Sequence, residues 1–392
     1  MRLKDITILS PQYVGDDIAS EVSFVPMESL RNGTIDYKTI SFAQAKGKYT
    51  YFTNQDLLIA KVTPCFENGN IAIADNLLNN VGFGSSEIFV LRPNKNVLSK
   101  YLFYLSQSRD FQGKACATMC GVGGLKRISP QFMRTYEIDM PSLEAQQRLV
   151  TYLDTKLSEI DHQVSLLTSK RDAYLRLKKS IINHAVTRGL NSNVKMKDSG
   201  IEWIGEMPEH WKPCRFKDFL KLCTITSNSI NKIGLENIES GTGRFLETNT
   251  EFEGNGVEFK KGNIVYGKLR PYLQKVWIAE FSGNAVGDFF VFNTQKNTMP
   301  SYIKYLMLSD KFTKEADRST AGAKMPRVSS NFILSLHYCL PPLQEQRLIA
   351  AYLDDKCSKI DAITVNLDKQ ISRYADLKRS LIDEVITGKR AV

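Results

Sequence analysis

The chain has 392 residues, enough for two or three domains of ordinary size. Its 42% hydrophobic and 24% charged residues are typical of a folded globular protein and exclude extensive disorder. No apolar run is long enough for a membrane-spanning helix, and no export signal follows Met1. The seven cysteines lack the spacing of a zinc site, so we expect free thiols and a cytoplasmic location. The net charge of +10 is compatible with nucleic-acid binding.

Residues 1–140 are predicted to form a mixed α+β globule. Short apolar runs bounded by Gly, Asn and Pro indicate strands at 56–61, 71–74 and 87–91. A helix is predicted near 98–112. A unit of this size can bury enough apolar surface to have a core of its own.

Residues 141–189 are predicted to form one long helix. Pro141 precedes a run without Pro or Gly, and Gly189 follows it, as helix start and stop signals require. Apolar side chains recur every seven residues, which indicates a coiled-coil seam that lapses at Lys178. The seam positions are Leu153, Ile160, Leu167, Tyr174 and Ile181.

Residues 190–212 show no clear period and are predicted to be a linker anchored by Trp203 and Trp211. Residues 213–340 are predicted to form a second α+β globule. Its expected elements are strands at 263–266, 275–279 and 288–292, and a helix near 300–316.

Residues 341–390 repeat the first long helix. The segment from Pro341 to Asp354 matches the segment from Pro141 to Asp154 at an offset of 200 residues, and the match continues without a gap to Lys389. The two globules are also similar, but more weakly. An isolated amphipathic helix of roughly 60 Å cannot bury its apolar stripe, so we expect the two helices to pack antiparallel in a pseudo-twofold repeat. The second seam is Leu353, Ile360, Leu367, Tyr374 and Leu381.

Basic side chains recur at equivalent places in the two globules, next to predicted strand ends and in the loops ahead of the long helices. Cations in such loops suit contact with DNA phosphates, although a solvated surface lysine is the alternative for any single one. The predicted DNA-binding residues are Lys61, Lys126, Arg127, Lys260, Lys261, Lys268, Arg270, Lys275, Lys324 and Arg327.

No motif predicts catalysis. The segment 262–269 has the spacing of a phosphate loop, but Leu269 stands where a metal-binding Ser or Thr is needed. The Asn-Pro-Pro-Tyr and Asp-Pro-Pro-Tyr tetrapeptides of amino-methyltransferases are absent, and the four histidines do not recur between the repeats. The paired acids on the helices suit capping, ion pairing or partner contact. We therefore predict a binding protein rather than an enzyme, with no metal and no cofactor of its own.

The motif Pro-x-Leu-x-x-Gln-x-x-apolar-x-x-Tyr-Leu-Asp, which follows each globule, resembles that of the specificity subunit of type I restriction–modification systems. The runs Lys178-Lys-Ser-Ile-Ile and Lys378-Arg-Ser-Leu-Ile near the helix ends agree with this resemblance, as does the segment 198–211. That segment has no counterpart before the first globule, which begins almost directly at Met1.

The resemblance implies a function in DNA recognition. Each globule would be a target-recognition domain that reads one half of a bipartite, asymmetric sequence of double-stranded DNA. The helices would form a spacer and dock two modification subunits, which methylate adenine with S-adenosylmethionine, and restriction subunits that use ATP would join the full complex. The expected spacer and docking residues are Tyr152, Asp154, Ile160, Asp161, Leu167, Tyr174, Tyr352, Asp354, Ile360, Asp361, Leu367 and Tyr374.

Two alternatives stay open from the sequence. A DNA adenine methyltransferase that acts alone would bind S-adenosylmethionine as an isolated chain. A coiled-coil scaffold without DNA function would show no salt-dependent binding to duplex DNA.

Overall fold

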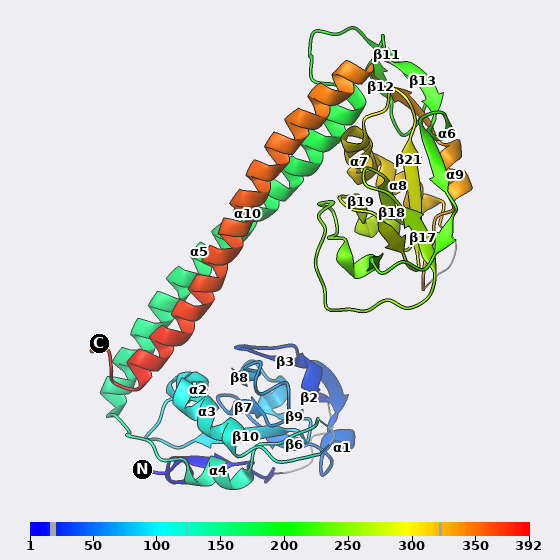
Figure 1. The fold of residues 1–392 in the computed structure, drawn as a ribbon. Coiled ribbons are helices and arrows are strands. Elements are labelled where there is room, and N and C mark those ends of the chain that lie inside the picture. Colours follow the sequence, from blue (N-terminus) through cyan, green and yellow to red (C-terminus); the bar gives the residue numbers. More distant parts are fainter. Residues whose placement is uncertain (16–20, 123, 321–323) are drawn as a thin grey trace. The chain divides into compact units, whose positions relative to one another are not determined.

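The computed structural model describes residues 1–15, 21–122, 124–320 and 324–392, shown as a ribbon in Figure 1. The chain forms two compact units, Met1–Leu167 with Lys369–Val392, and Thr168–Asp368. The two long helices, α5 (Leu143–Arg188) and α10 (Leu343–Ile386), each contribute one part to each unit. The predicted mixture of helix and sheet with two long helices is confirmed.

The strands of the first unit form two four-stranded sheets, in the orders β1-β10-β7-β8 and β5-β2-β9-β6, and a two-stranded hairpin, β3-β4. All pairings are antiparallel except that of β2 with β9. The predicted strands at 56–61, 71–74 and 87–91 are β7, β8 and β10. The strand bounds are β1 Thr7–Leu9, β2 Glu21–Val25, β3 Leu30–Arg31, β4 Thr34–Ile35, β5 Lys38–Ser41, β6 Thr50–Phe52, β7 Leu57–Ala60, β8 Ile71–Ile73, β9 Gly82–Gly84 and β10 Ile88–Pro93.

The helix predicted near 98–112 is two helices, α2 and α3. The two helices are separated by Ser108, whose backbone is extended and whose hydroxyl accepts a hydrogen bond from the Phe111 amide. Such N-capping explains why a new helix begins there. The helices of this unit, besides its part of the long pair, are α1 Phe42–Ala45, α2 Ser99–Gln107, α3 Arg109–Ala117, α4 Pro130–Thr135 and the 3₁₀ helices Leu3–Asp5, Met27–Ser29 and Leu78–Asn80.

The largest core of the first unit joins its sheet and its helices to the long helix pair. Leu153 and Ile160 from the early part of α5 belong to the same buried cluster as Leu381 and Val385 from the end of α10. The beginning of one helix therefore packs against the end of the other, so the predicted antiparallel pairing holds within this unit.

The second unit repeats this plan. Its sheet β14-β21-β18-β19 has the same strand order as β1-β10-β7-β8, and a second sheet has the order β15-β17-β20-β16. Two further strand pairs are β11-β12 and β13-β22. The strand bounds are β11 Met196–Asp198, β12 Glu206–Pro208, β13 Lys212–Arg215, β14 Leu220–Cys223, β15 Thr226–Ser227, β16 Lys232–Ile233, β17 Gly256–Phe259, β18 Ile264–Gly267, β19 Val276–Ile278, β20 Gly283–Ala285, β21 Phe289–Thr294 and β22 His337–Leu340.

The helix predicted near 300–316 is again divided, at Ser309, which caps the Phe312 amide. The core of this unit includes Ala185 and Val186 from the end of α5 and Ile349 and Leu353 from the start of α10. The helices, besides the long pair, are α6 Phe216–Phe219, α7 Pro300–Leu308, α8 Asp310–Arg318, α9 Ser330–Ser335 and the 3₁₀ helices Leu235–Asn237 and Pro271–Leu273.

The segment predicted to be a linker contains the strand pair β11-β12. Trp211 after it is fully buried, and its indole nitrogen donates to Glu345 Oε2 at 3.2 Å. Trp203 stacks on Tyr338 with ring centroids 5.9 Å apart. Both tryptophans are therefore anchors, as predicted. None of the helices in the described residues is both long and apolar enough to cross a membrane.

Candidate nucleic-acid interface and helix pair

The structure brings Lys61, Lys126 and Arg127 together at the end of β7 in the first unit. The Ile128 amide donates to the Lys61 carbonyl at 2.9 Å, and the Lys126 amide donates to Thr63 Oγ1 at 3.0 Å. The Lys61 ammonium lies over the Phe89 ring, 5.3 Å from its centroid. We call residues 124–128 the first strand-end loop, because these backbone contacts hold it beside β7.

Arg127 is held by a carboxylate of its own domain. Its Nε and Nη2 donate to the two Glu87 carboxylate oxygens at 2.9 and 2.8 Å, a two-point contact that holds the guanidinium in one plane. The hydrogen bond from Arg127 lowers the pKa of Glu87. A DNA phosphate would have to use the remaining donors of this guanidinium or displace Glu87.

The second unit has the same arrangement at the end of β18. Arg327 donates to both oxygens of Asp288 at 2.9 Å, and Leu269 forms a β-bridge with Arg327. The Lys268 ammonium lies 3.8 Å from Asp288 Oδ1 and over the Phe290 ring. We call residues 324–328 the second strand-end loop, and its pairing with a strand end repeats that of the first.

Arg270 and Lys324 are exposed beside the second strand-end loop. The Arg270 amide donates to the Pro326 carbonyl at 2.8 Å, and its backbone is left-handed, with φ of 51°. These contacts bring Lys268, Arg270, Lys324 and Arg327 to one place.

The other three predicted DNA-binding residues lie elsewhere. Lys260 and Lys261 are exposed in the turn before β18, whereas Lys268 follows β18, so the two groups lie at opposite ends of that strand. The Lys275 ammonium donates to the carbonyls of Leu235 and Ile238, both at 2.7 Å. Burial lowers the pKa of Lys275. Lys275 therefore holds a 3₁₀ helix of its own domain.

Asp154 and Asp354 join each globule to a long helix. Asp154 accepts hydrogen bonds from the Tyr104 hydroxyl and from Lys100 Nζ. Asp354 accepts one from the Tyr305 hydroxyl at 2.6 Å. Burial and the neighbouring carboxylate raise the pKa of both tyrosines. These contacts fit the ion-pairing explanation of the repeated acids.

Asp161 and Asp361 explain why the heptad seam lapses at two lysines. Lys378 Nζ donates to Asp161 at 2.6 Å in the first unit, and Lys178 Nζ donates to Asp361 at 2.7 Å in the second. Each pair joins the two long helices. A charged contact thus replaces an apolar one at the same point of each repeat.

The remaining predicted helix residues differ in exposure. The apolar residues Ile160, Ile360 and Leu367 are buried within the chain, so they serve the helix packing. Tyr352 is 37% exposed, and Lys356 lies 5.7 Å from the centroid of its ring. Partly buried side chains, which have some surface for a partner, are Tyr152, Leu167, Tyr174 and Tyr374.

Gln146 and Gln346 join each globule to a long helix and are not among the predicted site residues. Both are fully buried. Gln346 Nε2 donates to the carbonyls of Pro341 and Asn297 at 2.9 and 3.1 Å, and its Oε1 accepts from the Met299 amide at 2.8 Å. Gln146 makes the same three contacts in the first unit, to the carbonyls of Pro141 and Asn96 and the Leu98 amide. The sequence contained a signal for this role, because the Gln is one of the residues that recur in the motif at the start of both long helices.

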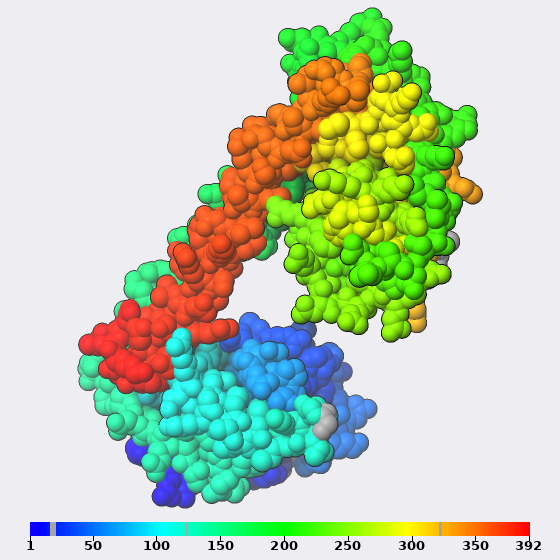
Figure 2. All heavy atoms as spheres, viewed as in Figure 1, coloured from blue at the N-terminus to red at the C-terminus, as the bar shows by residue number. Residues whose placement is uncertain are grey.

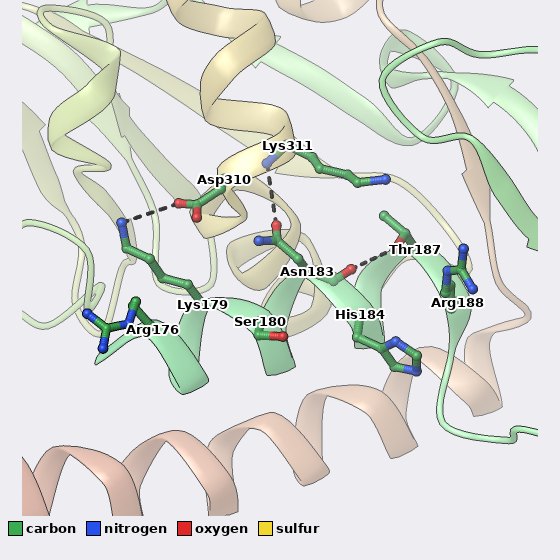
Figure 3. Close-up of a pocket in the computed structure, with 9 residues that line it drawn as sticks. All are labelled: Arg176, Lys179, Ser180, Asn183, His184, Thr187, Arg188, Asp310 and Lys311. Atoms are coloured by element: carbon green, nitrogen blue, oxygen red, sulfur yellow. Dashed lines mark hydrogen bonds and ion pairs between the residues drawn. The ribbon is translucent and has the colours of Figure 1, made fainter. Parts of the chain in front are cut away.

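A basic hollow of about 450 Å³ lies where α8 meets the end of α5 in the second unit (Figure 3). Lys179 Nζ lies 3.5 Å from Asp310, and the Lys311 amide donates to Asn183 Oδ1 at 3.4 Å. The Lys311 ammonium donates to the Ile204 carbonyl at 2.6 Å. Because these contacts seat α8 on the long helix, we assign the hollow a structural role.

Within the part of the chain that the structure describes, no group of three or more His, Cys, Asp and Glu side chains could hold a metal ion.

Comparison with known proteins identifies the family. The family described as "Type I restriction modification DNA specificity domain" matches residues 17–166 and 208–373. The EcoAI specificity subunit, of a type I restriction enzyme from Escherichia coli, is 30% identical over 184 residues, which are 46% of this chain and 31% of that protein. The MjaVIII specificity subunit from Methanocaldococcus jannaschii is 21% identical over 401 residues, which are 96% of this chain and 88% of that protein.

The match thus spans about a third of the EcoAI subunit and most of the MjaVIII subunit. Solved structures agree on the fold. A chain from a structure described as "complex assembly and conformational transition of the type I R-M system" has a TM-score of 0.77 at 14% identity, over 98% of this chain and 96% of that one. The HsdS subunit from Thermoanaerobacter tengcongensis has a TM-score of 0.56 at 15% identity, over 100% and 96%. Since the family match covers most of the sequence in two stretches, the chain belongs to the family of type I restriction–modification DNA specificity domains.

Proposed function

We propose that this chain is the non-catalytic DNA-recognition subunit of a type I restriction–modification complex. Residues 1–140 and 213–340 are its two target-recognition domains, and each reads one half of a bipartite, asymmetric DNA sequence. Residues 141–189 and 341–390 are spacer helices that set the distance between the half-sites, and residues 190–212 link the first spacer helix to the second domain.

The observation that carries this proposal is what the two repeats share. Both keep the pairing of a strand-end loop with its strand, through Arg127 with Glu87 and through Arg327 with Asp288. Both also keep the lysine–aspartate pair between the long helices. Outside this shared frame the two globules match only weakly in sequence. Two domains that bind DNA in the same orientation but recognise different half-sites are expected to share these framework contacts and to differ in their remaining surface.

The repeated long helices favour the binding of two copies of one partner. We propose that two modification subunits dock on the helix pair, since the repeated helices present two similar surfaces, and that restriction subunits join the full complex. S-adenosylmethionine and ATP would be bound by these partners. The complex would act on cytoplasmic DNA.

The first test concerns the second strand-end loop. Replacing Lys268 and Arg270 together by Ala should weaken binding of the chain with its modification subunits to duplex DNA. If both contact phosphates, the slope of log K against log[salt] should fall by about 1.8 in magnitude. Fluorescence anisotropy with a labelled duplex at several salt concentrations measures both effects.

The matched control replaces Lys195 and Lys197, exposed cations of the linker, by Ala. It makes the same change in net charge and should leave the slope unchanged. Unaltered affinity and slope in the first variant would remove the loop from the interface. The absence of any duplex binding by the wild-type complex, or binding of one equivalent of S-adenosylmethionine by the chain alone, would contradict the proposed function itself.

A further inference from the structure

A hairpin of the second recognition domain, residues 238–245, extends to helix α10. Ile238 and Phe245 form a β-bridge at its base, and the Glu239 amide donates to the Arg244 carbonyl at 3.0 Å. Thr242 bonds to Glu239 and accepts from the Arg244 amide at 3.2 Å. The turn is therefore shaped by its own hydrogen bonds.

The hairpin also lies close against its own sheet. At Gly243 the backbone has a φ of 73°, and a Cβ atom there would lie 2.8 Å from the Val276 carbonyl oxygen of β19. This close approach and the left-handed backbone both favour glycine. The hairpin thus presents Arg244 from a defined position.

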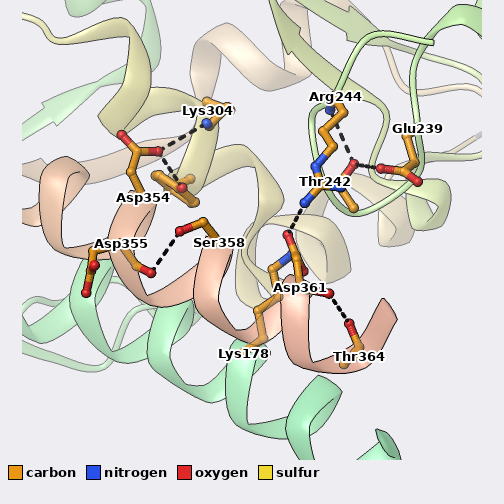
Figure 4. A network of polar contacts seen from close by, with 11 residues as sticks. Lys178, Glu239, Thr242, Arg244, Lys304, Asp354, Asp355, Ser358, Asp361 and Thr364 are labelled. Carbon is orange, nitrogen blue, oxygen red and sulfur yellow. Dashed lines mark hydrogen bonds and ion pairs between the residues drawn. The ribbon is translucent and has the colours of Figure 1, made fainter. Parts of the chain in front are cut away.

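Arg244 completes a three-residue ion bridge with the two long helices (Figure 4). Its Nη2 lies 2.9 Å from Asp361 Oδ2, and Lys178 Nζ lies 2.7 Å from Asp361 Oδ1. One carboxylate thereby joins α5, α10 and the recognition domain. In the space-filling view, yellow-green atoms of the domain touch the orange part of α10 (Figure 2).

The surroundings shield the Lys178–Asp361 part of this bridge from solvent, whereas the Arg244 side chain is 53% exposed. The side chains of Lys178 and Asp361 are 10% and 15% exposed. Attraction between charges is screened less by salt when the pair is partly buried. Lys178 therefore holds the Asp361 carboxylate in a partly buried position, where the Arg244 guanidinium reaches it from the hairpin.

The first recognition domain provides an internal comparison, because no such contact is found among residues 1–15, 21–122 and 124–140. Its hairpin, β3-β4, is short: the Gly33 amide donates to Ile71 of β8, and a Cβ atom at Gly33 would lie 3.5 Å from Phe103. Arg31 donates to the Leu30 carbonyl of the hairpin itself at 3.2 Å. Asp161, the counterpart of Asp361, pairs with Lys378 and is 60% exposed.

We infer that Arg244 is a positioning residue, which clasps the second recognition domain to the spacer helices and thereby restricts the gap length at which the second half-site is read. This inference rests on the proposed function. The inference concerns the second domain alone, because the contacts just described for the first domain include no equivalent of the Arg244–Asp361 ion pair.

The test replaces Arg244 by Met, which keeps the length of the side chain and removes its charge. The variant and the wild type, each with modification subunits, methylate a duplex library in which the gap between half-sites is varied one base pair at a time. We expect methylation at the neighbouring gaps, relative to the preferred gap, to rise by about fivefold, as loss of a modest ion pair allows. Arg244→Lys should restore most of the preference.

Arg318→Met is the matched control. Arg318 pairs with Glu315 in its own helix, α8, so this variant removes an ion pair that does not reach α10 and should leave the gap preference unchanged. Hydrogen exchange of the unbound chain gives a second readout. Amides of 238–245 and 357–364 should exchange faster in Arg244→Met, and those of 157–164 should not.

Unchanged gap preference together with unchanged exchange at 238–245 in Arg244→Met would overturn the inference. That result is distinguishable from failure of the proposed function. If the function fails, the wild-type complex methylates no bipartite sequence at any gap.

Discussion

At the scale of single residues, the buried glutamines Gln146 and Gln346 connect each globule to the start of a long helix. Each glutamine is fully buried and bonds to two carbonyls and one amide of the backbone around it. A buried backbone group without a partner costs free energy comparable to a lost hydrogen bond. This explains why the motif places Gln, which both donates and accepts, at the same position twice.

Replacing Gln346 by Ala should lower the free energy of unfolding of the second unit by about 3 kcal/mol, since three backbone groups lose their partner. Urea unfolding followed by tryptophan fluorescence measures this, because all three tryptophans lie in that unit. The control is Gln344→Ala at an exposed neighbouring position of the same helix, which should change stability by less than about 0.5 kcal/mol. Equal losses in the two variants would contradict the assigned role.

At the scale of elements, each strand-end loop is fastened to a strand by an arginine and a carboxylate. The pairs Arg127–Glu87 and Arg327–Asp288 recur in both globules with two-point geometry. The loops they hold carry Lys126, Arg127, Lys324 and Arg327, four of the ten predicted DNA-binding cations. Each arginine is therefore one of the predicted DNA-binding cations, and its contact with the carboxylate also positions the lysine of the same loop.

This fastening should depend on pH. The Arg327 guanidinium holds the pKa of Asp288 below its ordinary value. A carboxyl whose pKa is lower in the folded chain stabilises the fold above the ordinary carboxyl pKa, and this contribution is lost as the pH falls through the lowered value. Asp288→Asn should therefore be less stable than the wild type at neutral pH, and the difference should shrink below about pH 4.

Thermal unfolding of both proteins across this pH range measures the effect. Glu251→Gln, which changes an exposed carboxyl, is the control and should follow the wild type. A difference for Asp288→Asn that stays constant from neutral to acid pH would show that the ion pair is not its cause.

At the scale of the whole molecule, helices α5 and α10 are continuous through both compact units. If they form the spacer, inserting one heptad into each, after Leu167 and Leu367, preserves the seam and adds about 10 Å to each helix. The number of unread base pairs between the two methylated half-sites should therefore increase. Genome-wide mapping of methylated adenines measures the gap.

A seven-residue insertion after Ser192, beyond the end of α5, is the control for this experiment. It lengthens the chain but not the helices and should leave the gap as it is. An unchanged gap in the double-helix insertion would refute the spacer role while leaving DNA recognition intact.

The sequence by itself determined the repeat, the six singled-out strands and the two long helices. These depend on local signals: apolar periodicity, helix-stop glycines and turn residues that lie close together in the chain. It missed the breaks at Ser108 and Ser309, where a capping hydroxyl ends an otherwise continuous apolar pattern.

Only the tertiary structure decided which charged side chains are engaged within the protein. Lys275 and Lys268 look alike in the sequence, yet one ammonium binds two carbonyls some 40 residues away and the other lies at a strand end. In the same way, Asp361 meets both Lys178 and Arg244 only because the helices run antiparallel and a hairpin folds back. Ion pairs and buried polar contacts join residues far apart in the chain, so their partners follow from packing and not from any local pattern.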